Sequence, residues 1–152
     1  MNWFLTFKYL HILFAITAVG SNLTYAVWGA RAKADREHLG FALRGIKFLD
    51  DRVANPAYGG LLLTGLLMTF AGHISLTTTR FVQLGIVGFI AVAAIAAGLY
   101  SPTLKKQIQT LDESGWDSPA YQSLDQRSTI VGIVLAVAVV LIVLDMVFKP
   151  TF

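Results

Sequence analysis

Four long apolar stretches constrain this chain more than any other feature of its sequence. They cover about residues 3–28, 53–76, 81–101 and 129–148 of the 152. Each is longer than the roughly 18 residues that identify a candidate membrane-spanning helix. Four such spans take up about half of the chain, and the rest is connectors. The sequence therefore predicts one all-α integral membrane domain over residues 1–152, an antiparallel four-helix transmembrane bundle in the lipid bilayer, without a second, soluble domain.

The composition agrees with a membrane protein. Charged residues make up only 14% of the chain, against about 25% in a soluble domain. Cysteine is absent, which excludes disulfides, iron–sulfur clusters and covalently attached c-type haem. The net charge of +3 is expected from the cytoplasmic loops of a membrane protein and does not indicate a nucleic-acid partner. No HExxH, P-loop or GxGxxG motif occurs, so hydrolase and nucleotide chemistry have no support.

Lysine and arginine are distributed unequally between the two sides of the predicted bundle. The connector after the first span holds six of them and the connector after the third holds three, whereas the opposite side holds three. Because cytoplasmic loops carry an excess of these residues, we expect both connectors in the cytoplasm. With four spans, the N- and C-termini are then both outside.

The two charged connectors carry helical patterns. Between residues 39 and 53, apolar residues recur at helical spacing opposite a charged face. This pattern predicts an amphipathic cytoplasmic connector, which either lies on the inner surface or extends the second span. Asn55-Pro56 marks a break or the first turn of the buried segment. In the other connector we expect the third helix to continue until Gly115 and the fourth to begin at Ser118-Pro119.

Small residues recur at three- or four-residue spacing in the second and third spans. Such stripes let helix backbones approach closely in lipid. They favour a compact bundle, and a contact with a second copy or with a partner membrane subunit is the alternative. Glycines in the bundle also leave room for a flat cofactor. The small residues are Gly59, Gly60, Gly65, Gly85, Gly88, Ala91, Ala94 and Gly98.

Ionisable residues inside spans are costly and mark candidate functional sites. Lys8 and His11 lie one turn apart on the first span, His73 ends the second, and Asp145 lies on the fourth. All four belong to the outward half of the predicted bundle. Three further polar residues of the first span are expected to donate hydrogen bonds between helices: Ser21, Asn22 and Thr24.

Asp145 is the only acidic residue in any predicted span. It can pair with Lys149 at i,i+4, which is a weak local contact, or it can reach Lys8 or His11 across the bundle. We predict an intramembrane ion pair between Asp145 and Lys8, while Lys149 extends to the membrane interface.

His11 and His73 lie in the same leaflet on neighbouring helices, which makes them candidate axial ligands of a b-type haem. Such ligation requires the two imidazoles at a similar depth. If the second helix ends at Gly72, His73 is too shallow, whereas a helix that continues through Thr77 lowers it by about one turn. His11 can instead be a hydrogen-bonded core histidine. His38 lies in the charged connector and is expected to be solvated.

Three short segments carry a resemblance to known proteins: Phe7-Lys8-Tyr9-Leu10-His11-Ile12, the stretch from Asn55-Pro56 to Gly65, and Val147-Phe148-Lys149-Pro150. In these segments the chain resembles a group of small bacterial four-helix membrane proteins, which includes predicted integral membrane proteins of unknown function. That group is distantly similar to the membrane protoporphyrinogen oxidases of haem synthesis and to copper-resistance D-type membrane proteins. The resemblance covers the whole chain in outline and implies a location in the bacterial inner membrane.

The resemblance to the oxidases is incomplete at their functional positions. In that family a first-helix histidine is a haem ligand and a third-helix lysine is required. His11 matches the histidine, whereas residues 80–85 contain no lysine, and Arg127 is not followed by Asn-Glu. These departures argue against protoporphyrinogen oxidation and leave haem binding through His11 open.

Three functional hypotheses follow. The first is a small haem-b-associated membrane protein that passes electrons at the outer leaflet, with His11 as ligand and His73 as its partner. The second is a cofactor-free membrane anchor or assembly subunit, in which the polar residues serve packing. Copper handling has less support, because soft-ligand sites favour Cys and Met, and the chain has no Cys and three Met.

Overall fold

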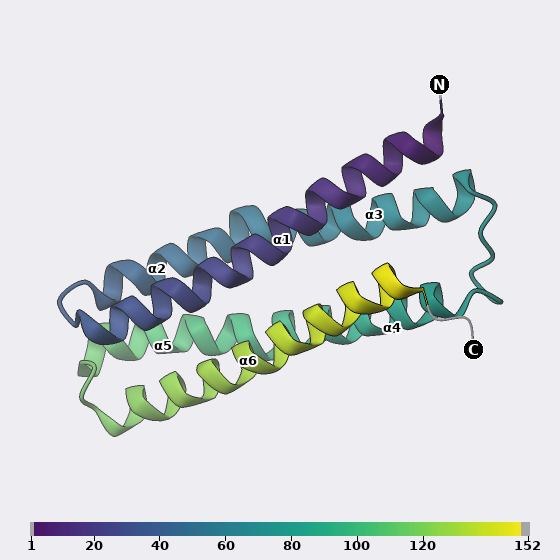
Figure 1. Ribbon diagram of the computed structural model, residues 1–152. Coiled ribbons are helices and arrows are strands. Elements are labelled where there is room, and N and C mark those ends of the chain that lie inside the picture. The colour runs from purple at the N-terminus through teal and green to yellow at the C-terminus, as the bar shows by residue number, and fades with distance from the viewer. Residues whose placement is uncertain (1, 150–152) are drawn as a thin grey trace.

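The chain forms four long helices joined by short turns in the computed structural model, which describes residues 2–149 (Figure 1). The second and third helices each contain a π-helical segment. The elements are α1 Trp3–Ala34, α2 Leu39–Leu49, η1 Asp50–Ala54, α3 Asn55–Ala71, α4 Arg80–Ile95, η2 Ala96–Tyr100, α5 Ser101–Ser114 and α6 Pro119–Phe148. Among the described residues, all four long helices have the length and apolar composition to cross a membrane. The predicted all-α class with four candidate spans is therefore confirmed.

Two helix ends lie where the sequence predicts them. Gly115 follows α5 with a φ of 79°, a left-handed conformation that glycine adopts without strain. Ser118 caps α6, because its hydroxyl accepts a hydrogen bond from the Tyr121 N–H at 3.3 Å. Pro119 occupies the first turn of α6, where its missing N–H costs nothing.

The end of α3 differs from the prediction. The helix ends at Ala71 rather than continuing to residue 76. Gly72 follows, and His73 takes a positive φ of 51°. The Ile74 N–H then donates to the Thr69 carbonyl at 2.9 Å, which satisfies a carbonyl that has no partner within the helix. The chain turns at Gly72, so α3 does not continue through Thr77.

The charged connector after α1 extends the second helix. The helix α2 runs through η1 into α3 without a break, so the alternative of a separate surface helix is not what the chain forms. The buried residues of α2 pack with Ala32 of α1 and Leu104 of α5. These buried residues are Leu39, Ala42, Leu43 and Ile46, which confirms the predicted amphipathic face.

Both π-helical segments stand directly before an X-Pro pair. Pro56 follows η1 at the start of α3, and Pro102 follows η2 at the start of α5. In a regular α-helix a proline ring clashes with the carbonyl four residues earlier. The wider π turn accommodates the proline, so that each long helix continues instead of breaking.

The helices α1 and α3 approach closely at glycines. A Cβ added at Gly60 would lie 2.5 Å from the Phe14 ring, and one at Gly72 would lie 2.9 Å from the Phe4 ring. Only glycine leaves these rings room. The partners run in opposite order along the two helices, so α1 and α3 point in opposite directions.

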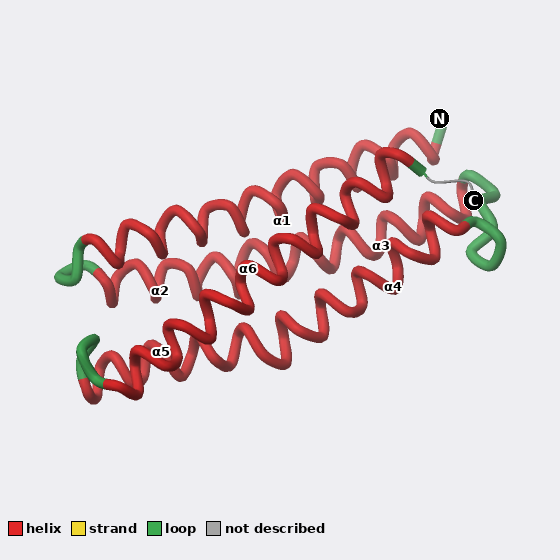
Figure 2. The backbone as a smooth tube through the Cα atoms, turned by 60° about the horizontal axis from the view of Figure 1, so that its bottom comes forward, coloured by secondary structure: helices red, strands yellow, loops and turns green. Residues whose placement is uncertain are grey.

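The helices α4 and α6 form a second close pair, which lies below the first in Figure 1; Figure 2 shows the same helices from another side. Gly85 faces Met146, and a Cβ added at Gly88 would lie 3.0 Å from Ile142. The two pairs meet mainly where α2 packs on α5. Part of each small-residue stripe therefore serves packing within the chain, whereas a Cβ added at Gly59 or Gly98 would meet nothing within 4 Å.

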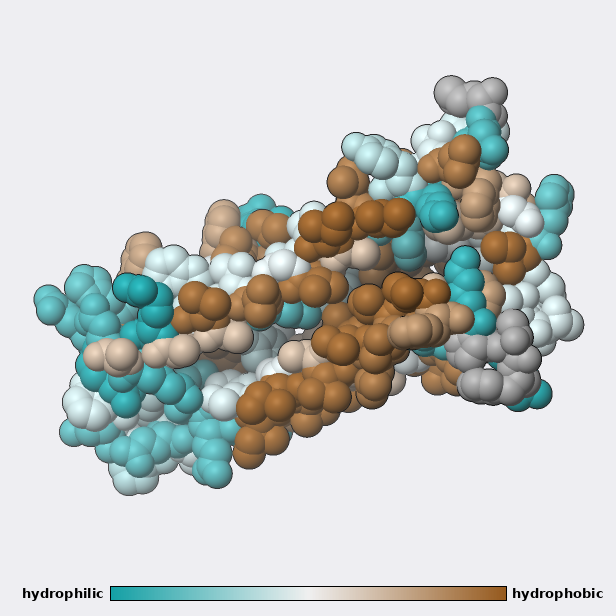
Figure 3. All heavy atoms as spheres, in the orientation of Figure 1, coloured by the Kyte–Doolittle hydropathy of each residue, from teal (hydrophilic) through white to brown (hydrophobic). Residues whose placement is uncertain are grey.

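One end of the molecule is polar and the rest of the visible face is mostly apolar (Figure 3). The polar end carries the turns around residues 35–38 and 115–118. Helices of 30 to 35 residues are about 45–53 Å long, whereas the hydrocarbon core of a bilayer is about 30 Å thick. The polar end therefore extends beyond the hydrocarbon core.

Candidate binding cavity

A cavity of about 380 Å³ lies between the four long helices. The surface of its lining is mostly apolar, and ten of the 24 lining residues carry a polar group. A mostly apolar surface with polar groups is the usual character of a small-molecule site. The polar lining residues are Asn22, Tyr25, Lys33, Asp50, Tyr58, Tyr100, Gln107, Asp125, Ser128 and Thr129.

Two of these side chains carry buried polar atoms without a partner. Asp50 is 7% exposed and Tyr25 is 8% exposed. Among the described residues, neither Asp50 Oδ2 nor Tyr25 Oη has a hydrogen-bond partner. Buried polar atoms are nearly always hydrogen-bonded in folded proteins. Two such atoms lining one cavity are therefore unusual.

Lys47 balances the charge of the Asp50 carboxylate without donating a hydrogen bond to its Oδ2. Its Nζ lies 3.9 Å from Asp50 Oδ2, which is beyond hydrogen-bond distance. The same Nζ makes a shorter contact with Asp51. One ammonium group therefore serves two carboxylates.

Tyrosines surround the same part of the cavity. The Asn22 amide donates to Tyr58 Oη at 2.7 Å and ties α1 to α3. The Tyr58 ring packs edge-on against Phe89 of α4, with 6.1 Å between the ring centroids. Tyr100, the last residue of η2, lines the cavity from the third long helix. Tyr25, Tyr58 and Tyr100 thus come from three different helices.

Three residues of α1 are predicted to donate hydrogen bonds between helices, and only Asn22 does so. Asn22 bonds to α3, as expected. The Ser21 hydroxyl donates to the Thr17 carbonyl at 2.8 Å and the Thr24 hydroxyl donates to the Gly20 carbonyl at 2.8 Å. Both hydroxyls therefore bond within α1, because a carbonyl four residues earlier is always in reach.

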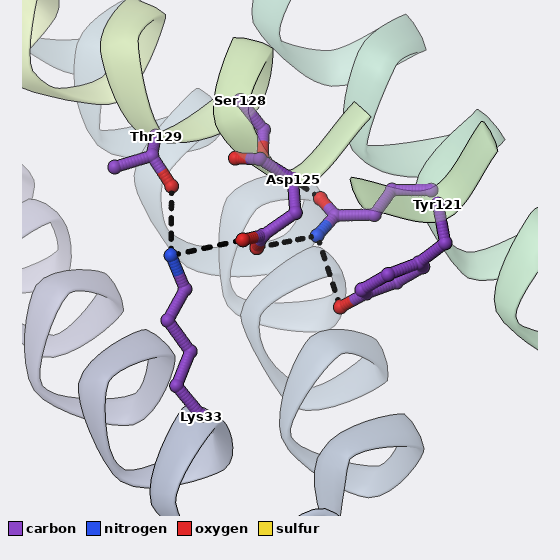
Figure 4. Close-up of polar contacts among 6 residues, drawn as sticks. Lys33, Tyr121, Asp125, Ser128 and Thr129 are labelled. Carbon is purple, nitrogen blue, oxygen red and sulfur yellow. Dashed lines mark hydrogen bonds and ion pairs between the residues drawn. The ribbon is translucent and has the colours of Figure 1, made fainter. Parts of the chain in front are cut away.

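A polar network lines the end of the cavity nearest the polar end of the molecule (Figure 4). Lys33 on α1 forms an ion pair with Asp125 on α6 at 3.0 Å and donates to the Thr129 hydroxyl at 3.2 Å. The Gln107 amide donates to Asp125 at 3.1 Å and accepts from the Ser128 hydroxyl at 2.8 Å. The network joins α1, α5 and α6, and its charged groups are matched within it.

His11 lies at the interface of α1 and α3, outside the cavity lining. Its Nδ1 is 3.0 Å from the Leu61 carbonyl and 3.1 Å from the Thr64 hydroxyl. The Thr64 hydroxyl is also 2.6 Å from the Gly60 carbonyl, to which it donates. A carbonyl can only accept, so Nδ1 carries the proton, and Nε2 is left with a lone pair. The imidazole rests against Gly65, where an added Cβ would lie 3.1 Å from Cε1.

The structure does not bring His73 to His11. His11 packs beside Gly65, while His73 follows Gly72, which packs beside Phe4. Gly65 and Gly72 are about 10 Å apart along a helix. The condition for paired axial ligation, a second helix that continues through Thr77, is therefore not met. His38 is exposed and bonds to Asp35 at 2.9 Å, away from both histidines.

The structure does not bring Lys8 and Asp145 together either. Asp145 faces α4, because its Oδ2 would lie 3.8 Å from a Cβ added at Gly85. Among the described residues this Oδ2 has no hydrogen-bond partner, and no ion pair links Asp145 to Lys8 or Lys149. The Lys149 Nζ lies 5.8 Å from the centroid of the Phe81 ring. The reason is the pairing of the helices, since α1 packs on α3 and α6 packs on α4.

A comparison with protein families decides which group the chain resembles. Residues 5–150 match the family described as predicted integral membrane protein (DUF2269). The chain belongs to this family. The match covers nearly the whole chain and agrees with the four candidate spans. No curated protein and no solved structure matches the chain.

Sequence reasoning did not find the cavity of this family member. Asp50 stands in the charged run Asp50-Asp51-Arg52, where it reads as a solvated residue. Tyr25, Tyr58 and Tyr100 are spread over three helices and read as ordinary apolar positions. The available signal was the X-Pro pair inside each of the two long helical patterns, because prolines at such positions accompany π-helical segments, which are frequent at functional sites.

Proposed function

We propose that this membrane protein binds a small molecule in the cavity between its four helices. The observation that carries the proposal is the pair of buried atoms without partners, Asp50 Oδ2 and Tyr25 Oη, on the lining of one cavity. An unsatisfied buried polar group costs about 1–3 kcal/mol. A ligand group that hydrogen-bonds to either atom recovers the share of that cost which belongs to the atom.

The placement of Asp50 and Tyr100 supports this function. Asp50 begins η1 and Tyr100 ends η2, so each of the two π-helical segments contributes a polar side chain to the cavity. A π turn adds a residue to the turn and changes the direction in which nearby side chains point. Both distortions of the helices thus serve the same cavity.

The proposal is tested with probes that share one skeleton and differ in charge: 4-phenylbutylamine, 4-phenylbutanol and 4-phenylbutyrate. A ligand that binds the folded protein raises its melting temperature by mass action. Melting in detergent is followed by the fluorescence of the three tryptophans. We expect at least one probe to raise the melting temperature of the wild type in a concentration-dependent way.

Two glycines of α1 provide a matched pair of variants for this test. A Cβ at Gly29 or at Gly20 meets nothing within 4 Å, but only Gly29 lines the cavity. Gly29→Leu should fill the cavity and abolish the shift, whereas Gly20→Leu should retain it. The proposal fails if no probe shifts the wild type, or if Gly29→Leu responds as the wild type does. A cofactor-free anchor or assembly subunit then becomes the better description.

Haem b binding through His11 is the second candidate function. The observation that favours it is the hydrogen bond from Nδ1 to the Leu61 carbonyl, since ligating histidines typically donate their other ring N–H to such a group. This bond fixes the tautomer and leaves Nε2 free to bind iron. Haem b, when bound, supplies reversible one-electron transfer. The chain's own contribution is to orient the imidazole between α1 and α3.

An absorption spectrum of the purified protein tests this second candidate. A Soret band that is lost in His11→Ala and kept in His38→Ala supports ligation by His11. Because His73 does not lie beside His11, His73→Ala should leave the spectrum unchanged. A wild-type spectrum in His11→Ala, or a colourless wild type after growth with added haem precursor, contradicts haem binding at His11.

We further place the protein in the bacterial inner membrane, with the polar end in the cytoplasm and both termini outside. The excess of lysine and arginine near the polar end supports this orientation. In this orientation the Lys33–Asp125 pair stands between the cavity and the cytoplasm, and His11 lies in the outer half of the bilayer.

A further inference from the structure

We infer that the ligand of the cavity is an amphipathic organic cation, in which a protonated amine binds Asp50 and Tyr25 and an apolar body fills the rest of the cavity. This inference rests on the proposed function and names its ligand class. It follows from the charge balance of the lining, from the two atoms without partners, and from the three tyrosines.

The charge of the lining favours a cation. Three charged residues line the cavity: Lys33, Asp50 and Asp125. Lys33 and Asp125 neutralise each other at 3.0 Å, so Asp50 is the remaining ionisable side chain of these three on the lining. Behind the lining, Lys47 contacts both Asp50 and Asp51, so this group of three carries a net negative charge. A monovalent cation in the cavity completes the balance.

The hydrogen-bonding capacity of the two buried atoms also fits an ammonium group. An ammonium has only donors. Asp50 Oδ2 can only accept when ionised, and the Tyr25 hydroxyl oxygen accepts as well as donates. A protonated amine therefore supplies donors that suit both side chains, and its bond to the Asp50 carboxylate is charge-assisted.

The aromatic lining adds to this selectivity. Tyr25, Tyr58 and Tyr100 line the cavity together with Asp50. Aromatic rings around a cation attract it through their negative faces, which is how proteins commonly recognise ammonium ligands. The remaining lining, which includes Val92, Ile133 and Leu135, suits an apolar body.

An anion or a neutral molecule fits the lining less well. Among the described residues, Lys33 is the only cation on the lining, and it is already paired with Asp125 and Thr129. A carboxylate ligand therefore finds a donor in the Tyr25 hydroxyl but no free counter-charge. A neutral alcohol can bond to Asp50 Oδ2, but it leaves the carboxylate charge without a counter-charge. These two classes serve as the contrasting outcomes of the test.

The test compares the affinities of 4-phenylbutylamine, 4-phenylbutanol and 4-phenylbutyrate for the purified wild type at pH 7, where the amine is cationic. A hydrogen bond to a charged group is worth about tenfold or more in affinity. We expect the amine to bind at least about tenfold more tightly than the alcohol, and the carboxylate not to bind. Equal or tighter binding of the alcohol or the carboxylate overturns the cation inference while leaving the cavity function intact. Binding of none of the three overturns the proposed function itself.

Matched variants then locate the amine. Asp50→Asn and Tyr25→Phe change one polar group each and keep the side-chain shape, whereas Asp112→Asn makes the same carboxylate-to-amide change on the surface, where Asp112 pairs with Arg44. We expect Asp50→Asn to weaken amine binding by about tenfold or more and to leave alcohol binding almost unchanged. Tyr25→Phe should weaken amine binding less, and Asp112→Asn should not weaken it. Retained alcohol binding shows that each variant is folded. Amine affinity that is unchanged in Asp50→Asn overturns the inference.

Discussion

At the helix contacts of this protein, the group opposite a residue on the next helix decides which side chain that residue can carry. Adjacent glycines of α3 illustrate this. Gly60 faces the Phe14 ring and admits no side chain, whereas Gly59 faces open space. The sequence predicts that such stripes pack helices, but it does not show which glycine of a pair is in contact, because that depends on the rotation of α3 about its axis.

This difference gives a stability prediction. Gly60→Ala should lower the free energy of unfolding by about 1–3 kcal/mol, because its Cβ would lie 2.5 Å from the Phe14 ring. Gly59→Ala should be neutral or slightly stabilising, because alanine is the better helix former. Melting of both variants in the same detergent checks the prediction. Equal effects of the two substitutions would mean that α1 and α3 do not meet at Gly60.

The candidate site illustrates what residue patterns miss. His11, Lys8 and Asp145 attract attention because they are ionisable residues inside apolar stretches. In the structure His11 packs against α3, Asp145 faces α4 and Lys8 is exposed. Asp50 lines the cavity, but the sequence does not single it out as a site residue, because its neighbours in sequence are charged. Burial of Asp50 depends on how α2 packs on α5, and this long-range contact has no local signature.

At the scale of elements, most helix boundaries follow from local chemistry. The Ser118 cap, the Gly115 stop and the amphipathic face of α2 are all visible in the sequence and present in the structure. The end of α3 is not visible in the sequence, because apolar and β-branched residues continue past Gly72. The sequence does not predict η1 and η2 either. A proline inside a helical pattern is compatible with a break in the helix as well as with a π turn.

The ion pair between α1 and α6 carries an element-scale prediction. Lys33 is 42% exposed, so its pair with Asp125 should contribute only about 0.5–1 kcal/mol. A double-mutant cycle with Lys33→Met and Asp125→Asn, measured by unfolding in detergent, gives this coupling energy directly. We expect Asp125→Ala to cost more than Asp125→Asn, because the alanine also removes the acceptor of the buried Gln107 amide, which an asparagine oxygen keeps. Strictly additive effects would show that this contact does not hold the two helices together.

At the scale of the whole molecule, the polar end and the apolar remainder define an orientation. The chain has no cysteine, so single cysteines can be introduced without background. Cysteines at Arg36 and Ser114, both exposed at the polar end, should resist a membrane-impermeant thiol reagent in intact cells. A cysteine at Thr78, exposed in the turn between α3 and α4, should react. The reverse labelling pattern would invert the orientation.

The position of a bound ligand tests the central claim most directly. A crystal structure with 4-(4-bromophenyl)butylamine locates the bromine by its anomalous scattering, independently of any detergent effect on affinity. We predict the bromine inside the cavity near Val92 and Leu135, with the amine nitrogen about 2.7–2.9 Å from Asp50 Oδ2. Bromine only on the lipid-facing surface, with the cavity free of ligand density, would contradict the claim that a binding site lies between the four helices.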